Sequence, residues 1–217
     1  MLKTKLKASA VTNLTDARYF AAWEVEWLGF CLDPQAENYI PPRDMKAMKE
    51  WVDGVKIVGE FDLQSAEEIR SAIDLLELDA IQVGPFTEVD TLMDLQSSVP
   101  VIKELIFSRD TSIETIESSL EQFAAHTAYF LFNFDKNGLS LEHLSAAGAT
   151  ISYTWLKEIC EQYPVLLSIS IAPEQLESLL SDVRLEGLNV VGGEEEKVGY
   201  KSFDELDELF EVLEVQI

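Results

Sequence analysis

Positively charged side chains are scarce in this 217-residue sequence. It contains 16 Lys and Arg residues against 40 Asp and Glu residues, which gives a formal net charge of −24 at pH 7. Nucleic acids are bound through basic surfaces that neutralise their phosphates, and anionic lipid headgroups attract the same kind of surface. The charge balance therefore excludes nucleic acid and an anionic membrane surface as partners.

Histidine and cysteine are scarce as well, with two residues of each. Neither Cys31 nor Cys160 belongs to a CxxC pair or to a Cys/His spacing that would bind zinc. We therefore expect no metal and no cofactor. We also expect both cysteines to be free, buried thiols, as in proteins of a reducing cytoplasm.

Long apolar runs are absent. No run approaches the roughly 18 residues that a membrane-spanning helix requires. Residues 1–10 contain lysines but lack the apolar segment of a signal peptide. The sequence thus predicts a cytoplasmic protein without a membrane span. Its composition, 47% apolar and 26% charged, is typical of a globular protein and not of a disordered one.

What the sequence does contain is a regular alternation of two kinds of segment. Short apolar runs, many of them rich in β-branched residues, predict strands, and the segments between them, with apolar residues three and four positions apart, predict amphipathic helices. Ser65 and Glu68 form a capping-box signature at the start of one helix. The predicted strands are residues 5–11, 27–32, 55–59, 80–83, 101–107, 128–134, 165–171 and 187–191, and the predicted helices are 15–23, 42–51, 65–76, 88–95, 111–123, 154–163, 173–182 and 202–213.

Eight strand–helix units in this length favour a closed barrel. Near-continuous apolar strands that alternate with helices are typical of a parallel sheet covered by helices. Eight such units fit a single (β/α)8 TIM-barrel domain over residues 1–217 better than an open sheet. In that fold the functional residues lie in the loops at the carboxyl ends of the strands. Those loops are rich in acids and hydroxyls here and contain almost no arginine.

Several short motifs at these positions resemble the phosphoribosylanthranilate isomerase family, the barrels of tryptophan biosynthesis that catalyse an Amadori rearrangement. Residues 7–13 (KASAVTN) are similar to the family's opening segment K-I-C-G-I-T-N. Further matches follow in the family's order: LGF at 28–30, VGEF at 58–61, IQV at 81–83, VIK at 101–103, YTW at 153–155, and Gly193, Glu195, Gly199 and Lys201. The resemblance covers essentially the whole chain. It implies the barrel fold and a small phosphorylated metabolite as the ligand.

The resemblance also indicates the positions of the proton-transfer groups. The family's general base, the cysteine of K-x-C-G, aligns with Ser9, and its general acid, an aspartate at the end of the sixth strand, aligns with Asn133. A hydroxyl needs a neighbouring base to act as a proton acceptor, and an amide cannot serve as the acid. Cys31 and Asp135 are candidate replacements, although we favour a buried core residue and a solvated loop acid, respectively, as their interpretation.

The family's substrate-binding positions are substituted in the same way. Asn38 aligns with an arginine that would bind a carboxylate through two hydrogen bonds, and Gly84 aligns with a histidine. The glycines and serines of the family's phosphate site align with residues whose branched side chains, or neighbouring glutamates, disfavour a dianion. These aligned positions are Gly148, Ile169, Ser170, Val191, Gly192 and Gly193.

Three hypotheses remain open. In the first, which the substitutions favour, the barrel has lost or changed the family's reaction. In the second, it remains an isomerase with displaced acid and base. In the third, it is a non-catalytic interaction subunit that uses the acidic face of residues 204–211, although the solvated side of the last barrel helix explains that face more simply. The sequence does not indicate an oligomeric state.

Overall fold

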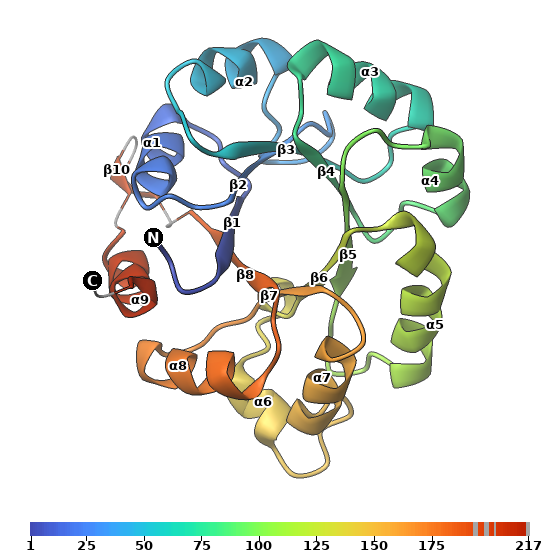
Figure 1. The fold of residues 1–217 in the computed structure, drawn as a ribbon, viewed down its shortest axis with the longest axis vertical. Helices are drawn as coiled ribbons and strands as arrows, with labels where there is room; N and C mark the ends of the chain where they lie inside the picture. Colours follow the sequence, from blue (N-terminus) through green and yellow to red (C-terminus); the bar gives the residue numbers. More distant parts are fainter. Residues whose placement is uncertain (193–194, 198–199, 202, 216–217) are drawn as a thin grey trace.

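Eight parallel strands form a closed barrel in chain order, and β8 returns to pair with β1. The computed structural model describes residues 1–192, 195–197, 200–201 and 203–215. Figure 1 looks along the barrel, with the strands in a central ring and the helices around it. The predicted (β/α)8 fold is confirmed. The barrel strands are β1 (Lys5–Ser9), β2 (Trp27–Cys31), β3 (Lys56–Phe61), β4 (Ala80–Val83), β5 (Val101–Ile106), β6 (Tyr129–Asn133), β7 (Val165–Ser168) and β8 (Gly187–Val191).

A helix follows each barrel strand, and most helices begin and end within two residues of their predicted limits. The capping box at Ser65 is present, because the Glu68 backbone N–H donates to Ser65 Oγ at 3.3 Å and the Ser65 N–H donates to Glu68 Oε2 at 2.8 Å. The helices are α1 (Leu14–Ala22), α2 (Pro42–Lys49), α3 (Ala66–Leu76), α4 (Val89–Leu95), α5 (Ile113–Phe123), α6 (Leu141–Ser145), α7 (Tyr153–Cys160), α8 (Pro173–Asp182) and α9 (Asp204–Leu213).

The sequence analysis missed several small elements between the regular units. These are helix α6, the 3-10 turns η1 (Ala124–His126) and η2 (Asp135–Asn137), and the antiparallel pair β9 (Glu195–Lys197) and β10 (Tyr200–Lys201) after β8. They are too short to produce a hydrophobic period. Of them, η2 begins with Asp135, two residues after the end of β6.

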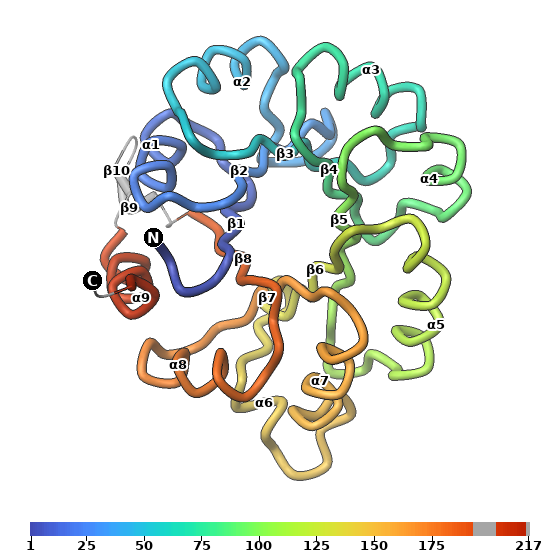
Figure 2. Tube along the Cα trace, in the orientation of Figure 1, coloured from blue at the N-terminus to red at the C-terminus, as the bar shows by residue number. Residues whose placement is uncertain are grey.

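The ring of helices closes where the two ends of the chain meet. Figure 2 traces the chain once around the barrel, from the first helix in blue to the last in red. The indole of Trp23 stacks on Phe210 with ring centroids 4.9 Å apart, and Tyr19 Oη donates a hydrogen bond to Asp207 at 2.6 Å. The apolar side of α9 is thus buried against α1, as expected for a last barrel helix.

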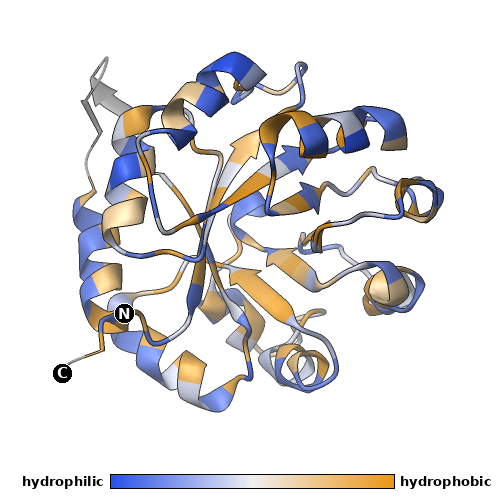
Figure 3. Ribbon diagram, turned by 45° about the horizontal axis from the view of Figure 1, so that its top comes forward, coloured by the Kyte–Doolittle hydropathy of each residue, from blue (hydrophilic) through white to orange (hydrophobic). Residues whose placement is uncertain are grey.

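The inside of the barrel has two layers of different character. The lower layer is apolar and almost fully buried, and it consists of Trp27, Val58, Ala80, Ile102, Leu131 and Leu166. A separate, larger apolar core lies between the strands and the helices, and Figure 3 shows the hydrophobic residues concentrated along the strands. Side chains alternate between the two faces of a strand, so the residue two positions after each lower-layer residue faces the same way. Those next residues form the upper layer, and most of them are polar.

Candidate functional site

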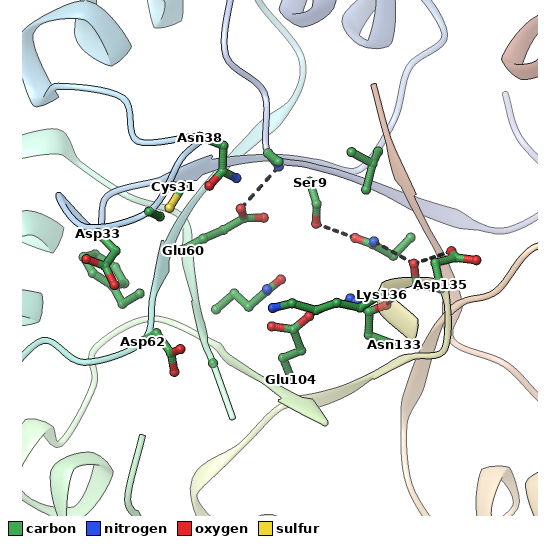
Figure 4. Close-up of a pocket in the computed structure, with 18 residues that line it drawn as sticks. Ser9, Cys31, Asp33, Asn38, Glu60, Asp62, Glu104, Asn133, Asp135 and Lys136 are labelled. Carbon is green, nitrogen blue, oxygen red and sulfur yellow. Dashed lines mark hydrogen bonds between the residues drawn. The ribbon is translucent and has the colours of Figure 1, made fainter. Parts of the chain in front are cut away.

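A cavity of about 430 Å³ opens above the upper layer, at the carboxyl ends of the strands. Its volume lies within the usual range for small-molecule sites. Figure 4 shows Ser9, Glu60, Glu104, Asn133 and Asp135 arranged around the opening. The complete lining is Ser9, Ala10, Cys31, Asp33, Ala36, Asn38, Glu60, Phe61, Asp62, Gln82, Gly84, Glu104, Asn133, Asp135, Lys136, Ser168, Asn189 and Val191.

Lys7 and Glu60 form a buried ion pair at the base of this site. Lys7 Nζ lies 2.5 Å from Glu60 Oε1, and the lysine side chain is fully buried. The pair crosses in front of Gly29 on β2, where a β-carbon would lie 2.1 Å from Glu60 Oε1 and 2.8 Å from Lys7 Nζ. A glycine is therefore required on the strand between them.

Ser9 is held on both sides. Lys7 Nζ donates to its Oγ at 2.5 Å, and the Ser9 hydroxyl donates to Asn189 Oδ1 at 2.7 Å. No histidine follows Ser9 in its loop, but Lys7 lies two residues earlier on the same face of β1. That neighbour donates its hydrogen bond to the hydroxyl and forms an ion pair with Glu60.

A chain of hydrogen bonds continues from Ser9 across the mouth to Asp135. Asn189 Nδ2 donates to Ser168 Oγ at 3.3 Å, and the Ser168 hydroxyl donates to Asp135 Oδ2 at 2.8 Å, as Figure 4 shows. Partial burial of the Asp135 carboxylate raises its pKa, while hydrogen bonds from the Ser168 hydroxyl and the Ser170 backbone N–H oppose the rise. Asp135 therefore lies at the rim of the cavity as an exposed residue of the loop after β6, and its carboxylate accepts a hydrogen bond from the Ser168 hydroxyl.

Asn133, at the end of β6, is fixed by its neighbour on β5. Its Nδ2 donates to Glu104 Oε1 at 2.7 Å, and its Oδ1 accepts the Lys136 backbone N–H at 3.0 Å. The two bonds fix which atom of the amide is the donor. A carboxylate stands beside this position, so the site contains an acid at β5 and an amide at β6.

Cys31 lines the cavity and is also largely buried. Burial raises the pKa of its thiol, and the nearby carboxylates of Glu60, Asp33 and Asp62 raise it further. The thiolate is the form that would accept a proton, and this acidic environment disfavours it. The prediction that both cysteines are free, buried thiols is confirmed.

The loop after β4 is held by Lys103 and Asp62. Lys103 Nζ donates to the carbonyl oxygens of Gly84 (2.6 Å) and Thr87 (3.0 Å), and it lies 4.5 Å from the centre of the Phe123 ring. Burial lowers the pKa of Lys103 to about 8, although nearby acids oppose the shift. A β-carbon on Gly84 would lie 2.3 Å from Asp62 Oδ1, which explains the glycine at this position.

The structure brings together seven of the predicted site residues. Ser9, Cys31, Asn38, Gly84, Asn133, Asp135 and Val191 all line the cavity. Gly148 lies apart from it, in a second pocket of about 280 Å³ beside Arg109 and His143.

The predicted phosphate positions lie mostly outside the cavity lining. Ile169 is buried in the core, Ser170 is exposed, and Gly192 follows β8 without joining the lining. Gly193 lies outside the described residues. Val191 does line the cavity and is 54% exposed.

The sequence patterns assigned no role in the site to six further residues of this layer: Lys7, Glu60, Gln82, Glu104, Ser168 and Asn189. A usable signal existed, because each lies two positions before or after another inward-facing residue of its strand. If this two-residue spacing is applied to all eight strands, it identifies the whole polar layer.

Within the described parts of the chain, no group of three or more His, Cys, Asp or Glu side chains is placed to hold a metal ion. In the same parts, no helix has the length and apolar character that crossing a membrane requires.

The fold and the cavity define a (β/α)8 barrel with its candidate site at the carboxyl ends of the strands, where barrels of this class carry their active sites. The chain belongs to the family described as "N-(5'phosphoribosyl)anthranilate (PRA) isomerase", whose profile matches residues 6–212.

Known members of this family are similar to the chain over nearly its whole length. The N-(5'-phosphoribosyl)anthranilate isomerase of Maridesulfovibrio salexigens is 24% identical over 205 residues, which cover 94% of this chain and 96% of that protein. The crystal structure of the Thermus thermophilus phosphoribosyl anthranilate isomerase superposes with a TM-score of 0.74 at 25% identity and covers 97% of this chain and 98% of that one.

A third similar structure is a phosphoribosyl anthranilate isomerase in complex with reduced 1-(o-carboxyphenylamino)-1-deoxyribulose 5-phosphate. It has a TM-score of 0.73 at 20% identity, with 97% of this chain and 98% of that chain covered. At this identity, the similarity shows a shared fold.

Proposed function

We propose that this barrel has diverged from its family and no longer catalyses the Amadori rearrangement of phosphoribosylanthranilate at the family's rate. The state of Ser9 carries the proposal. Its hydroxyl accepts a hydrogen bond from Lys7 and donates one to Asn189 Oδ1, and neither the donating lysine nor the amide oxygen is a base that would take the hydroxyl proton. The position that aligns with the family's general base therefore offers no proton acceptor to a substrate.

The position of the general acid supports the same conclusion. Asn133 has no acidic proton, and its amide is already bonded to Glu104 and to the Lys136 backbone. Loss of a single general acid or base typically costs about 10²- to 10⁴-fold in rate. Substitution of both groups makes a rate near that of the known members unattainable by the family's route.

The polar groups after β7 are a third support. A similar structure binds a 5-phosphate compound, and a phosphate is commonly held by backbone N–H groups in the last two loops of such barrels. In this chain the Ser168 hydroxyl donates to the Asp135 carboxylate at 2.8 Å, and the Ser170 backbone helps to lower the pKa of that carboxyl. A carboxylate of the protein therefore lies against polar groups after β7 that could otherwise face a phosphate.

The test is a direct assay of the purified protein. Freshly prepared phosphoribosylanthranilate is fluorescent, and its consumption is followed by the decay of that signal, with the Thermus thermophilus isomerase as positive control. We expect kcat/KM at least about 10²-fold below that of the control. A value comparable to the control would overturn the proposal.

One observation favours a second candidate function, an isomerase with a displaced acid. The raised pKa of Asp135, together with its place in the cavity lining, suits a general acid. This candidate predicts measurable turnover that Asp135→Asn abolishes while Glu142→Gln, a change of an acid outside the cavity lining, leaves it unchanged. Turnover insensitive to Asp135→Asn would eliminate it.

A further inference from the structure

We propose that the cavity binds a small organic cation with two or more amino groups, such as an aliphatic di- or polyamine. The inference rests on the proposed function, because it assigns a new ligand class to the site that we propose has lost the family's reaction. Two independent features carry it: the charge of the lining and an unsatisfied buried acceptor.

The charge of the lining favours a cation. Five carboxylate side chains line the cavity, and Lys136 is the single basic side chain among the lining residues. The buried Lys7 offsets one of the acids, Glu60, through their ion pair. Lys103, buried behind the lining, also offsets part of the charge of Asp62 and Glu104, and with Asp33 and Asp135 an excess of negative charge remains around the opening. Such a potential attracts cations and repels a phosphate dianion.

Gln82 supplies the second feature. Its side chain lies on β4, lines the cavity and is 93% buried, since only 7% of its surface is exposed. Among the described residues no hydrogen-bond donor reaches its Oε1. A buried acceptor without a donor costs about 1–3 kcal/mol, so such groups are rare unless something else satisfies them. A ligand N–H reaching down from the cavity is a donor that would do so.

The arrangement of the acids indicates an extended ligand with several charges. The acids come from the ends of different strands: Asp33 follows β2, Asp62 follows β3, Glu104 lies on β5 and Asp135 follows β6. No three of the described acids converge closely enough to hold a metal ion. Separated amino groups on a flexible chain can reach several of these carboxylates and donate to Gln82 at the same time.

The experiment is calorimetric titration of the purified protein with spermidine at about 0.15 M salt, where weak attraction to distant surface acids is largely screened. The neutral diol 1,8-octanediol and the anion ribose 5-phosphate are titrated in parallel. We expect saturable, one-to-one binding of spermidine alone. No binding of spermidine, or tighter binding of ribose 5-phosphate, would overturn the proposal.

Variants then locate the bound amine. Gln82→Leu removes the acceptor and Glu104→Gln removes a charge, and each should weaken binding about 10-fold or more. The matched control is Glu205→Gln/Glu208→Gln, which removes two charges from exposed positions of α9. Equal weakening by the control, or no effect of either cavity variant, would show general attraction to an acidic protein and would refute the site. Thermal melts confirm that each variant is folded.

The isomerase assay separates the two proposals. Absence of amine binding together with absence of turnover refutes only the ligand class. Rapid turnover of phosphoribosylanthranilate refutes the proposed function, whatever the amine result.

Discussion

The side chain of Glu60 on β3 lies over Gly29 on β2 so closely that a methyl group on Gly29 would lie 2.1 Å from Glu60 Oε1. The space that this glycine leaves is occupied by the ion pair between Glu60 and Lys7. The upper layer of the barrel is therefore built around a residue that contributes no side chain.

Replacement of Gly29 by alanine should separate the buried ion pair. We expect Gly29→Ala to lower the free energy of unfolding by about 3 kcal/mol, because breaking such a pair leaves charges buried without compensation. Urea denaturation at pH 7 measures the change. Gly138→Ala is the control, since its backbone has φ +63° but nothing lies within 4 Å of the added carbon, and it should cost only about 1–2 kcal/mol. Equal losses in the two variants would contradict the prediction.

Ala10 adopts a backbone conformation that suits glycine. Its φ is +54°, at the position where the K-x-C-G motif has glycine, and its N–H donates to Glu60 Oε2 at 3.2 Å. Because this conformation costs an alanine about 1–2 kcal/mol, part of which is offset by the greater freedom of an unfolded glycine, Ala10→Gly should raise the free energy of unfolding by about 0.5 kcal/mol. Ala8→Gly, in the middle of β1, should lower it. A loss of stability in Ala10→Gly comparable to that in Ala8→Gly would show that the backbone there is not strained.

The stability of the protein should depend on having one carboxylate and one amide at positions 104 and 133. Asn133→Asp alone places two carboxylates 2.7 Å apart, where the amide now donates to Glu104, so one of their pKa values must rise. An acid with a raised pKa in the folded state destabilises the fold above the pKa of the unfolded state. We therefore expect a loss of about 2 kcal/mol at pH 8 and a smaller one at pH 5.

The double variant Glu104→Gln/Asn133→Asp tests the cause. The amide introduced on β5 can donate to the carboxylate introduced at the end of β6, so the double variant should recover most of the lost stability at pH 8. It also restores a carboxylate at the position of the family's acid. A double variant as unstable as the single one would show that the loss comes from packing and not from like charges.

Lys103 should make stability rise with pH in the alkaline range. Its pKa is about 8 in the folded protein, against 10.5 ordinarily. Between these values the unfolded chain binds one more proton than the folded chain, so the free energy of unfolding increases with pH. The gain is about 1 kcal/mol between pH 8 and pH 9, and it ends near pH 10.5.

A comparison with Lys103→Met isolates this effect. Burial raises the pKa values of Cys31 and Cys160, which lowers stability as pH rises, but both cysteines are present in the two proteins and cancel in the difference. The stability of wild type relative to Lys103→Met, from urea melts between pH 7 and 9.5, should be constant up to about pH 8 and then increase. A flat difference throughout would show that Lys103 titrates normally.

The fold could be predicted because strand and helix periods are properties of local sequence. All eight barrel strands are predicted by their apolar runs, and the errors lie at their ends. Residues 165–171 read as one strand because Ile169 and Ile171 are apolar, yet β7 ends at Ser168, and Ile169 packs in the core beyond it. Apolar character indicates burial, and a loop residue can be buried as well as a strand residue.

The site could be predicted only where a motif or a loop marked it. Ser9 and Asn133 are identified because they align with the family's proton-transfer groups, whereas Glu60 and Gln82 lie inside matched motifs that assign them no role, and Glu104 directly follows another such motif. Their role depends on how eight strands are staggered in the closed barrel. The partners of each side chain, such as Lys7 for Ser9 or Glu104 for Asn133, follow from that closure and not from the separate strands.

The two layers inside the barrel have different roles. The lower, apolar layer stabilises the fold, and the upper, polar layer lines the cavity. The packing of the lower layer, six residues that include Trp27 and Leu166, does not depend on which side chains form the upper layer. Residues of the upper layer can thus be substituted one strand at a time, by evolution or by design, to give a new specificity on an unchanged barrel.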